Sequence, residues 1–290
     1  LIFAQGQQTS DSLREALHTA QLLIEREAPG VYPVSLEPGT MVWKAMSTSH
    51  QLKDFYPDLK DPEFKTDSAL WHRRYSTNDH SRWTLAQPFS LIGHNGEVNS
   101  IRSMREASRD LKRYLRITQK ILLRGGSDSG DLDRMVKLFH SRGVPLAETL
   151  RRISQPAFDD IKHLPKPVRD YHSAVRRAIG PLSAVEGPAG IVAMDDRQVI
   201  AVLDGMGLRP MRVIETNRGF AIIASEVGAP AIPFAIIKRV HQLGAGEMVL
   251  IENGKILYPG EADKAIVGAS GFNYKELAGT KMLSLPNASD

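Results

Sequence analysis

The third of the chain that follows Pro188 contains three apolar segments, each interrupted by a short turn sequence. The segments read GIVAMDDRQVIAVLDG, MRVIETNRGFAIIAS and EMVLIENGKILYPG, with turns at Asp195-Asp196, Asn217-Arg218-Gly219 and Asn253-Gly254. Asn-Gly between β-branched runs is one of the strongest local signals for a β-hairpin. Because tight turns join strands that pair antiparallel, this region predicts an antiparallel meander.

The residues before Pro188 follow a mostly helical pattern. Apolar residues recur at helical spacing after a capping box at Ser12 to Glu15, and Pro29-Gly30 ends this helix. Further helices are expected at residues 50–56, 97–119, 146–153 and 167–178, and residues 124–140 read as a glycine turn, a cap and a helix. Strands are expected at Val31–Leu36 and Thr40–Ala45, which form a predicted hairpin, and at Ser68–Arg74 and Phe89–His94.

This order of elements predicts an α+β fold, since mixed elements are followed by helices and then by the meander. No internal repeat, low-complexity tract or convincing linker interrupts the chain. Residues 1–271 are therefore expected to form one domain, with an irregular tail over residues 272–290.

The composition excludes several kinds of chemistry. The 290 residues contain no cysteine, which removes disulfides, thiolate nucleophiles and Cys-ligated zinc or iron–sulfur clusters. There is no HExxH metal motif and no P-loop. The net charge of +4 comes from interspersed acidic and basic residues and does not indicate a nucleic-acid partner. No apolar run approaches the roughly 20 residues of a membrane span, and no export signal is evident, so a cytoplasmic location is expected.

Three short polar stretches are candidates for a binding site. In HRRYSTN, Arg74 can present a planar donor pair to a carboxylate. In HNGE, the Asn95 amide and the Gly96 N–H provide two donors for a carbonyl oxygen that becomes negative during attack. In GSDSG, Asp128 can receive an ammonium group.

Taken singly, each stretch favours a structural role. Arg74 can pair with an internal Asp, Asn-Gly turns are common, and Asp128 with its neighbouring serines can cap the following helix. Together the three stretches provide receptors for a carboxylate, an oxyanion and an ammonium group. These are the requirements for holding an α-amino acid whose side-chain amide is attacked, and glutamine fits them, although composition alone does not choose it.

Four longer blocks resemble the class II glutamine amidotransferase domain of the glutamate synthase large-subunit family. They lie between about Val42 and Gly260 in the family's order: VWKAMSTSHQLKDFYPDLKDPEF, HRRYSTNDHSRWTLAQPFSLIGHNGEVN, GSDSGDLDRMVKLF and LDGMGLRPMRVIETNRGFAIIASEVG. The resemblance implies an N-terminal-nucleophile hydrolase fold. That fold is a four-layer αββα sandwich, expected to be incomplete in this chain.

The resemblance also implies six site residues. They are Arg74 for the glutamine α-carboxylate, Thr77 and Asn78 beside it, Asn95 and Gly96 as the oxyanion hole, and Asp128 for the α-amino group. No metal ligand is implied.

In this family an N-terminal Cys attacks the glutamine amide, and ammonia passes to a synthase domain that carries FMN and an iron–sulfur cluster. Here residue 1 is Leu, and only about 40 residues precede the VWKAM block. The expectation is that the Cys-bearing N-terminal part of the domain is missing from this chain. FMN and the iron–sulfur cluster are then expected only in partner chains.

Three interpretations remain open from the sequence. The chain is the glutamine-binding part of a glutaminase, with its Cys supplied by another chain or segment and its ammonia delivered to a glutamate-synthase-like partner. Alternatively, it is a non-catalytic glutamine-sensing or scaffold subunit of an oxidoreductase complex. In the third interpretation, it is part of an ordinary synthase chain.

Overall fold

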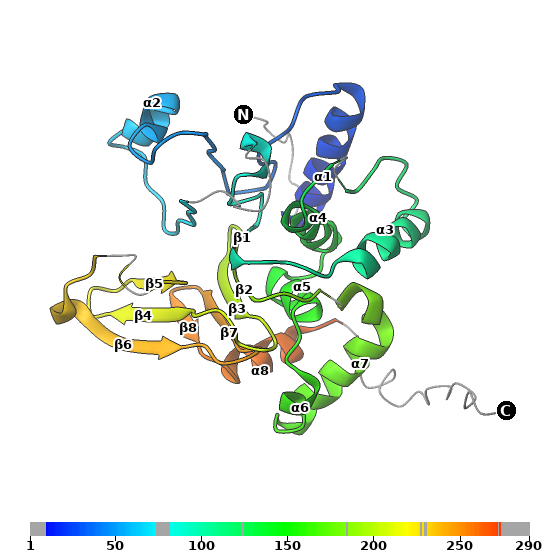
Figure 1. Ribbon diagram of the computed structural model, residues 1–290, viewed down its shortest axis with the longest axis vertical. Coiled ribbons are helices and arrows are strands. Elements are labelled where there is room, and N and C mark those ends of the chain that lie inside the picture. Colours follow the sequence, from blue (N-terminus) through cyan, green and yellow to red (C-terminus); the bar gives the residue numbers. More distant parts are fainter. Residues whose placement is uncertain are drawn as a thin grey trace.

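The computed structural model describes residues 10–73, 82–122, 125–183, 185–226, 228, 231–271 and 273, and contains two antiparallel sheets (Figure 1). The larger sheet has the strand order β1 (Ile92–Gly96), β2 (Ala189–Met194), β3 (Gln198–Leu203), β7 (Met248–Glu252) and β8 (Lys255–Leu257). The smaller sheet has the order β5 (Ala221–Ala224), β4 (Arg212–Thr216) and β6 (Ile237–Gln242).

The helices of these residues lie mostly in the first two thirds of the chain. They are α1 (Ser10–Glu27), α2 (Leu52–Phe55), α3 (Arg102–Tyr114), α4 (Asp128–Ser141), α5 (Leu146–Ile153), α6 (Phe158–Ile161), α7 (Lys166–Ser183) and α8 (Glu261–Ala269). Short 3-10 helices lie at Pro57–Lys60, Trp83–Leu85 and Phe234–Ile236.

Side-chain alternation along the strands divides the larger sheet into two buried faces. Ile200 and Val202 of β3 pack into a core shared with helices α4, α5, α7 and α8. Ala201 and Leu203 point to the opposite face and pack against Val213 of the smaller sheet. Because strand side chains point alternately to either side, a continuous apolar strand such as β3 can serve both cores at once.

The result is a layer of helices, the larger sheet and then the smaller sheet (Figure 1). This arrangement confirms the predicted α+β class, and it supplies three of the four layers of the expected αββα sandwich. On the outer face of the smaller sheet, Val240 is 51% exposed. The described residues therefore leave that face open to solvent.

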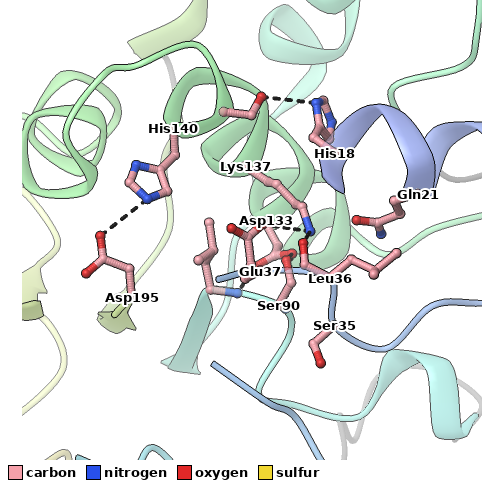
Figure 2. Close-up of polar contacts among 12 residues, drawn as sticks. His18, Gln21, Ser35, Leu36, Glu37, Ser90, Asp133, Lys137, His140 and Asp195 are labelled. Carbon is pink, nitrogen blue, oxygen red and sulfur yellow. Dashed lines mark hydrogen bonds and ion pairs between the residues drawn. The ribbon is translucent and has the colours of Figure 1, made fainter. Parts of the chain in front are cut away.

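Two of the predicted N-terminal strands are wrong. Glu37 and Thr40 form only an isolated bridge, and the segments on either side of it are irregular. Pro33 lies within the first segment and has no N–H to donate to a strand partner. Instead, Lys137 of α4 donates to the Leu36 carbonyl at 2.9 Å and pairs with Glu37 at 2.7 Å (Figure 2).

Other boundaries also differ from the predictions. Residues 68–73 are irregular rather than a strand, and the strand expected at Phe89–His94 runs from Ile92 to Gly96. The helix expected at residues 97–119 covers Arg102–Tyr114. It begins late because Ser100 pairs with Glu186 as an extension of the sheet. The predicted tail, residues 272–290, lies outside the described part of the chain apart from Asn273.

No helix within the described ranges is long and apolar enough to cross a bilayer.

Candidate functional site

An open pocket lies where the edge of β1, the start of α4 and the smaller sheet meet. Its volume is about 1630 Å³, and Asn95, Gly96 and Asp128 all line it. Two separate stretches of sequence, HNGE and GSDSG, therefore bring their predicted site residues to one cavity. His72 and Arg73, which immediately precede the predicted Arg74, also line this pocket.

Asn95 lies on the face of β1 that looks toward the smaller sheet, because it pairs with Gly190 rather than with the helix-facing Ile191. Its Nδ2 donates a hydrogen bond to Ser225 Oγ, just beyond β5, at 3.0 Å. A primary amide carries two N–H donors. The contact with Ser225 orients the Asn95 amide and leaves its second N–H for a ligand.

Gly96 occupies a backbone position that only glycine fits. Its φ is +122°, and a Cβ built there would lie 1.8 Å from the Pro188 carbonyl oxygen. A side chain at this position is excluded both by the neighbouring backbone and by conformation. Gly96 thus ends strand β1 rather than forming a tight Asn-Gly turn.

The hydrogen-bonding pattern of β1 shows where the Gly96 N–H points. Ile92 N and His94 N donate to side chains outside the sheet, Asp133 at 3.1 Å and Gln87 at 2.6 Å. Glu97 N instead bonds back to Pro188 O of the adjoining chain at 3.1 Å. Because N–H groups along an antiparallel strand alternate between its two edges, the Gly96 N–H points away from β2, toward the open edge.

The first turn of α4 presents Asp128. Ser127 is the N-cap, and its Oγ accepts from Gly130 N at 3.1 Å. Ser127 rather than Asp128 therefore caps helix α4. The Asp128 side chain is 40% exposed and pairs with Arg105 of α3 at 2.7 Å.

Arg105 also pairs with the buried Asp131, one turn further along α4, at 2.6 Å. One guanidinium thus serves two carboxylates, so Asp128 keeps net negative charge at the pocket mouth. An acidic group there suits a ligand ammonium. Sequence reasoning did not identify Arg105 because its partners come from a separate helix.

Arg74, Thr77 and Asn78 fall at residues 74–81, outside the described residues. Their assignment to a substrate carboxylate therefore stays a prediction.

His94 is a further residue of the site. It belongs to the HNGE stretch, but the sequence did not suggest a role for it. It is 6% exposed, and its Nε2 lies 2.5 Å from Ser129 Oγ, beside Asp128. Burial, followed by the charge on His72, lowers the pKa of His94 to about 4. His94 is therefore neutral near pH 7. The HNG motif carried a signal for this residue, but only the fold reveals its partner Ser129.

Within the described ranges, no group of three or more His, Asp or Glu side chains is placed to hold a metal ion. The predicted site residues bring to the pocket the amide of Asn95 and the N–H of Gly96 as donors, and the carboxylate of Asp128 as an acceptor. Such a set suits a zwitterionic amino acid with an amide carbonyl.

The chain matches the family model for class II glutamine amidotransferases over residues 6–276. The chloroplastic ferredoxin-dependent glutamate synthase of Oryza sativa subsp. japonica is 33% identical over 288 residues, covering 91% of this chain and 17% of that protein. The NADPH glutamate synthase large chain of Bacillus subtilis (strain 168) is 32% identical over 263 residues, covering 84% of this chain and 16% of that protein.

Among solved structures, the glutamine phosphoribosylpyrophosphate amidotransferase of B. subtilis aligns with a TM-score of 0.40 at 22% identity. That alignment covers 64% of this chain and 33% of the other. The chain thus spans about a sixth of the curated relatives it matches. The family match extends over nearly all of these 290 residues, and the chain belongs to the class II glutamine amidotransferases.

Proposed function

We propose that this chain binds glutamine and holds its side-chain amide for hydrolysis to glutamate and ammonia. The observation that carries the proposal is the meeting of Asn95, Gly96 and Asp128 in one pocket. These residues come from β1 and α4, so their meeting is a product of the fold and not of sequence proximity. Membership of the class II glutamine amidotransferases supports the same chemistry.

The amide carbonyl of glutamine would lie between the second N–H of Asn95 and the N–H of Gly96. Attack on this carbonyl places negative charge on its oxygen, and two fixed donors stabilise that charge without having to reorganise. Removing one such donor from an oxyanion hole typically raises the barrier by about 3 kcal/mol. The contact of Asn95 with Ser225 keeps the amide in place before the substrate arrives.

The α-amino group of glutamine would pair with Asp128, and its α-carboxylate with Arg74. Arg105 neutralises part of the acidic charge on Asp128 and Asp131. Glutamine is a zwitterion, so two opposite charges at the pocket select it over simple amides. Thr77 and Asn78 are proposed to complete the carboxylate receptor.

The nucleophile comes from outside these 290 residues, which contain no cysteine. We assign it to a Cys-bearing N-terminal segment or separate subunit. The ammonia acceptor is a glutamate-synthase-like partner, in line with the large synthases to which this chain is similar. An iron–sulfur cluster requires thiolate ligands that this chain lacks, so that cluster and FMN are placed on the partner. A cytoplasmic location accords with this metabolism.

The test combines binding and turnover. Calorimetry of the 290-residue chain with glutamine is expected to show binding that Arg74→Ala weakens by about 1.5–3 kcal/mol, the range for a hydrogen bond to a charged group. Arg102→Ala is the matched control, because the Arg102 side chain is 91% exposed and pairs only with Glu106 on its own helix in the structure. Equal affinity for the two variants would remove the role given to Arg74.

Turnover is measured on the purified assembly, with intact-mass analysis to identify a companion polypeptide that begins with Cys. Release of glutamate and ammonia from glutamine is the expected result. Glutamine binding without any hydrolysis would instead favour the non-catalytic sensing subunit. Absence of both would leave a scaffold role and overturn the proposal.

A further inference from the structure

His94 lies at the centre of the pocket wall and is not used by the chemistry above. It is 94% buried, on the strand position directly before Asn95. Successive strand side chains point to opposite faces, so His94 projects toward the helices while Asn95 projects toward the smaller sheet. A hydrogen bond that holds the His94 side chain therefore also restrains the strand backbone from which Asn95 projects.

Three polar groups of His94 are tied to three separate segments. Its ring Nε2 is hydrogen-bonded to Ser129 Oγ of α4 at 2.5 Å. Its backbone N–H donates to Gln87 Oε1 at 2.6 Å, and its carbonyl accepts from His72 Nε2 at 3.1 Å.

Two of these segments adjoin a proposed substrate receptor in the sequence. Ser129 follows Asp128, the ammonium receptor, and His72 lies two residues before Arg74, the carboxylate receptor. Asn95 and Gly96, the oxyanion donors, follow His94 itself. His94 thus hydrogen-bonds to Ser129, which follows the ammonium receptor, and to His72, and it directly precedes the oxyanion donors on β1.

We propose that His94 is a positioning residue that sets the spacing between the oxyanion donors on β1 and the ammonium receptor on α4, through its hydrogen bond to Ser129. The inference rests on the proposed glutamine site and adds a residue pair to it. Glutamine places its amide at a fixed number of bonds from its α-amino group. The enzyme must match that distance, and a misplacement of about 1 Å can reduce turnover about 100-fold.

An acid–base role for His94 is less consistent with its surroundings. The ring is removed from solvent, and the nitrogen that is bonded, Nε2, is already engaged with a hydroxyl of the protein. The burial that lowers its pKa to about 4 keeps the ring neutral throughout the range where glutaminases are assayed. A positioning role requires only this constant, neutral state.

The variants that test the proposal separate the hydrogen bond from the volume of the ring. His94→Leu and Ser129→Ala each remove the bond from one side, and His94→Gln keeps a polar group near the position of Nε2. Ser127→Ala is a structural comparison, because it removes the N-cap of the same helix without touching His94. Turnover is measured on the Cys-containing assembly and divided by the amount of reactive thiol, titrated with an alkylating glutamine analogue.

His94→Leu and Ser129→Ala are each expected to lower kcat about 10- to 100-fold while KM changes less than about 3-fold, the pattern of a lost alignment rather than lost binding. The double variant is expected to be no worse than the poorer single variant, because both substitutions remove one interaction. His94→Gln is expected to recover most of kcat and to leave its pH profile unchanged. Ser127→Ala is expected to lower thermal stability, because it removes an N-cap, without a comparable loss of kcat.

Three results would overturn the positioning role in an assembly whose wild type is active. They are an unchanged kcat in His94→Leu, multiplicative losses in the double variant, and a pH limb of the wild-type profile that vanishes in His94→Gln. A wild-type assembly that neither binds nor hydrolyses glutamine would overturn the proposed function itself, and this inference with it.

Discussion

Lys44 is a buried cation for which the structure shows no hydrogen-bond acceptor. It is 6% exposed, and its Nζ lies 4.9 Å from the centroid of the Phe89 ring and 5.5 Å from that of Tyr32. Burial lowers the pKa of Lys44 to about 8, although the nearby Asp133 carboxylate acts in the opposite direction. Charge at this position therefore costs free energy that the two aromatic rings only partly offset.

Lys44→Met is expected to raise the free energy of unfolding at pH 7 by about 2 kcal/mol. The substitution removes the cost of burying a charge, and it also loses the smaller stabilisation that the two rings give to the ammonium group. Since the folded-state pKa of about 8 lies below the ordinary lysine pKa of 10.5, the unfolded chain binds more protons between these two pH values. Stability of the wild type therefore rises across that window, and the advantage of Lys44→Met shrinks. Urea unfolding at pH 7 and at pH 10.5 measures both effects.

Lys53→Met is the control, because Lys53 is exposed on the short helix α2. It is expected to change stability little at either pH. A Lys44→Met protein that is less stable than wild type at pH 7 would show that the two rings more than compensate for burial of the charge.

For single residues, the sequence could identify those with a recognisable local motif, but it could not identify the residues that contact them. The Asn95-Gly96 pair was proposed from residue type, and the structure places both residues at the pocket, with Gly96 at a positive φ. Ser225 and Arg105 contact Asn95 and Asp128 from other elements. Nothing within a few residues of either partner encodes that contact, so only the folded chain reveals it.

Helix α4 holds the start of strand β1 in place through one carboxylate, that of Asp133. Asp133 Oδ1 accepts from Leu91 N at 2.9 Å and Ile92 N at 3.1 Å. Its Oδ2 accepts from Ser90 N at 3.2 Å and Ser90 Oγ at 2.6 Å (Figure 2). Four donors at the open edge of the sheet are thus satisfied by a side chain instead of a neighbouring strand.

Asp133→Asn is expected to destabilise the protein by about 1–3 kcal/mol, because one amide N–H would face the donors of Ser90 and leave them unsatisfied. Since β1 continues into Asn95 and Gly96, hydrolysis is expected to fall as well. Thermal unfolding and turnover of the same preparation measure the two effects. Asp110→Asn is a control, because Asp110 is exposed and pairs only with Arg113 on its own helix in the structure. A fully stable Asp133→Asn protein would refute this role.

Hairpins and long helices were the elements most readily predicted. The three expected turns do connect β2 to β3, β4 to β5 and β7 to β8, and the helix predicted at Leu146–Ile153 has those bounds. The segment Val31–Leu36 was mistaken for a strand because its β-branched residues resemble one locally. Its carbonyl at Leu36 bonds to Lys137, a contact with α4 that its own sequence does not indicate.

In the whole molecule, two hydrophobic cores share the larger sheet. The first lies between this sheet and the helices and includes Met135 of α4. The second lies between the two sheets and is centred on Met211 and Val213. A Cβ at Gly190 of β2 would lie 2.7 Å from Met211 Cε, so the Met211 side chain packs directly over Gly190.

The sequence predicted the antiparallel character of the last third of the chain but not its division into two sheets. The three predicted segments read as similarly apolar, since β3 and β7 are buried on both faces, and β6, with the sequence IKRVHQ, was not among them. Which strands neighbour one another depends on contacts distant in sequence, such as the pairing of β3 with β7 and of β4 with β6. The pocket between the sheets follows from that topology, and so could not be derived from local patterns.

The two cores are expected to respond differently to cavity-forming substitutions. Met211→Ala and Met135→Ala each remove a side chain that is almost fully buried, and each is expected to cost about 2–5 kcal/mol. Met211 packs in the smaller core, which lies between the three-stranded sheet and the larger sheet. Native-state hydrogen exchange of Met211→Ala should therefore show loss of protection first in β4, β5 and β6, while β2, β3 and the helices stay protected.

Met135→Ala should instead lower protection throughout, because its core connects the larger sheet to the helices. The pocket is lined from both sheets, so bound glutamine is expected to restore part of the protection lost in Met211→Ala, as a ligand specific for the folded state adds to its stability. If Met211→Ala lost protection equally in both sheets, the molecule would unfold as one cooperative unit. The smaller sheet, which lines one side of the glutamine site, would then not unfold independently of the larger sheet.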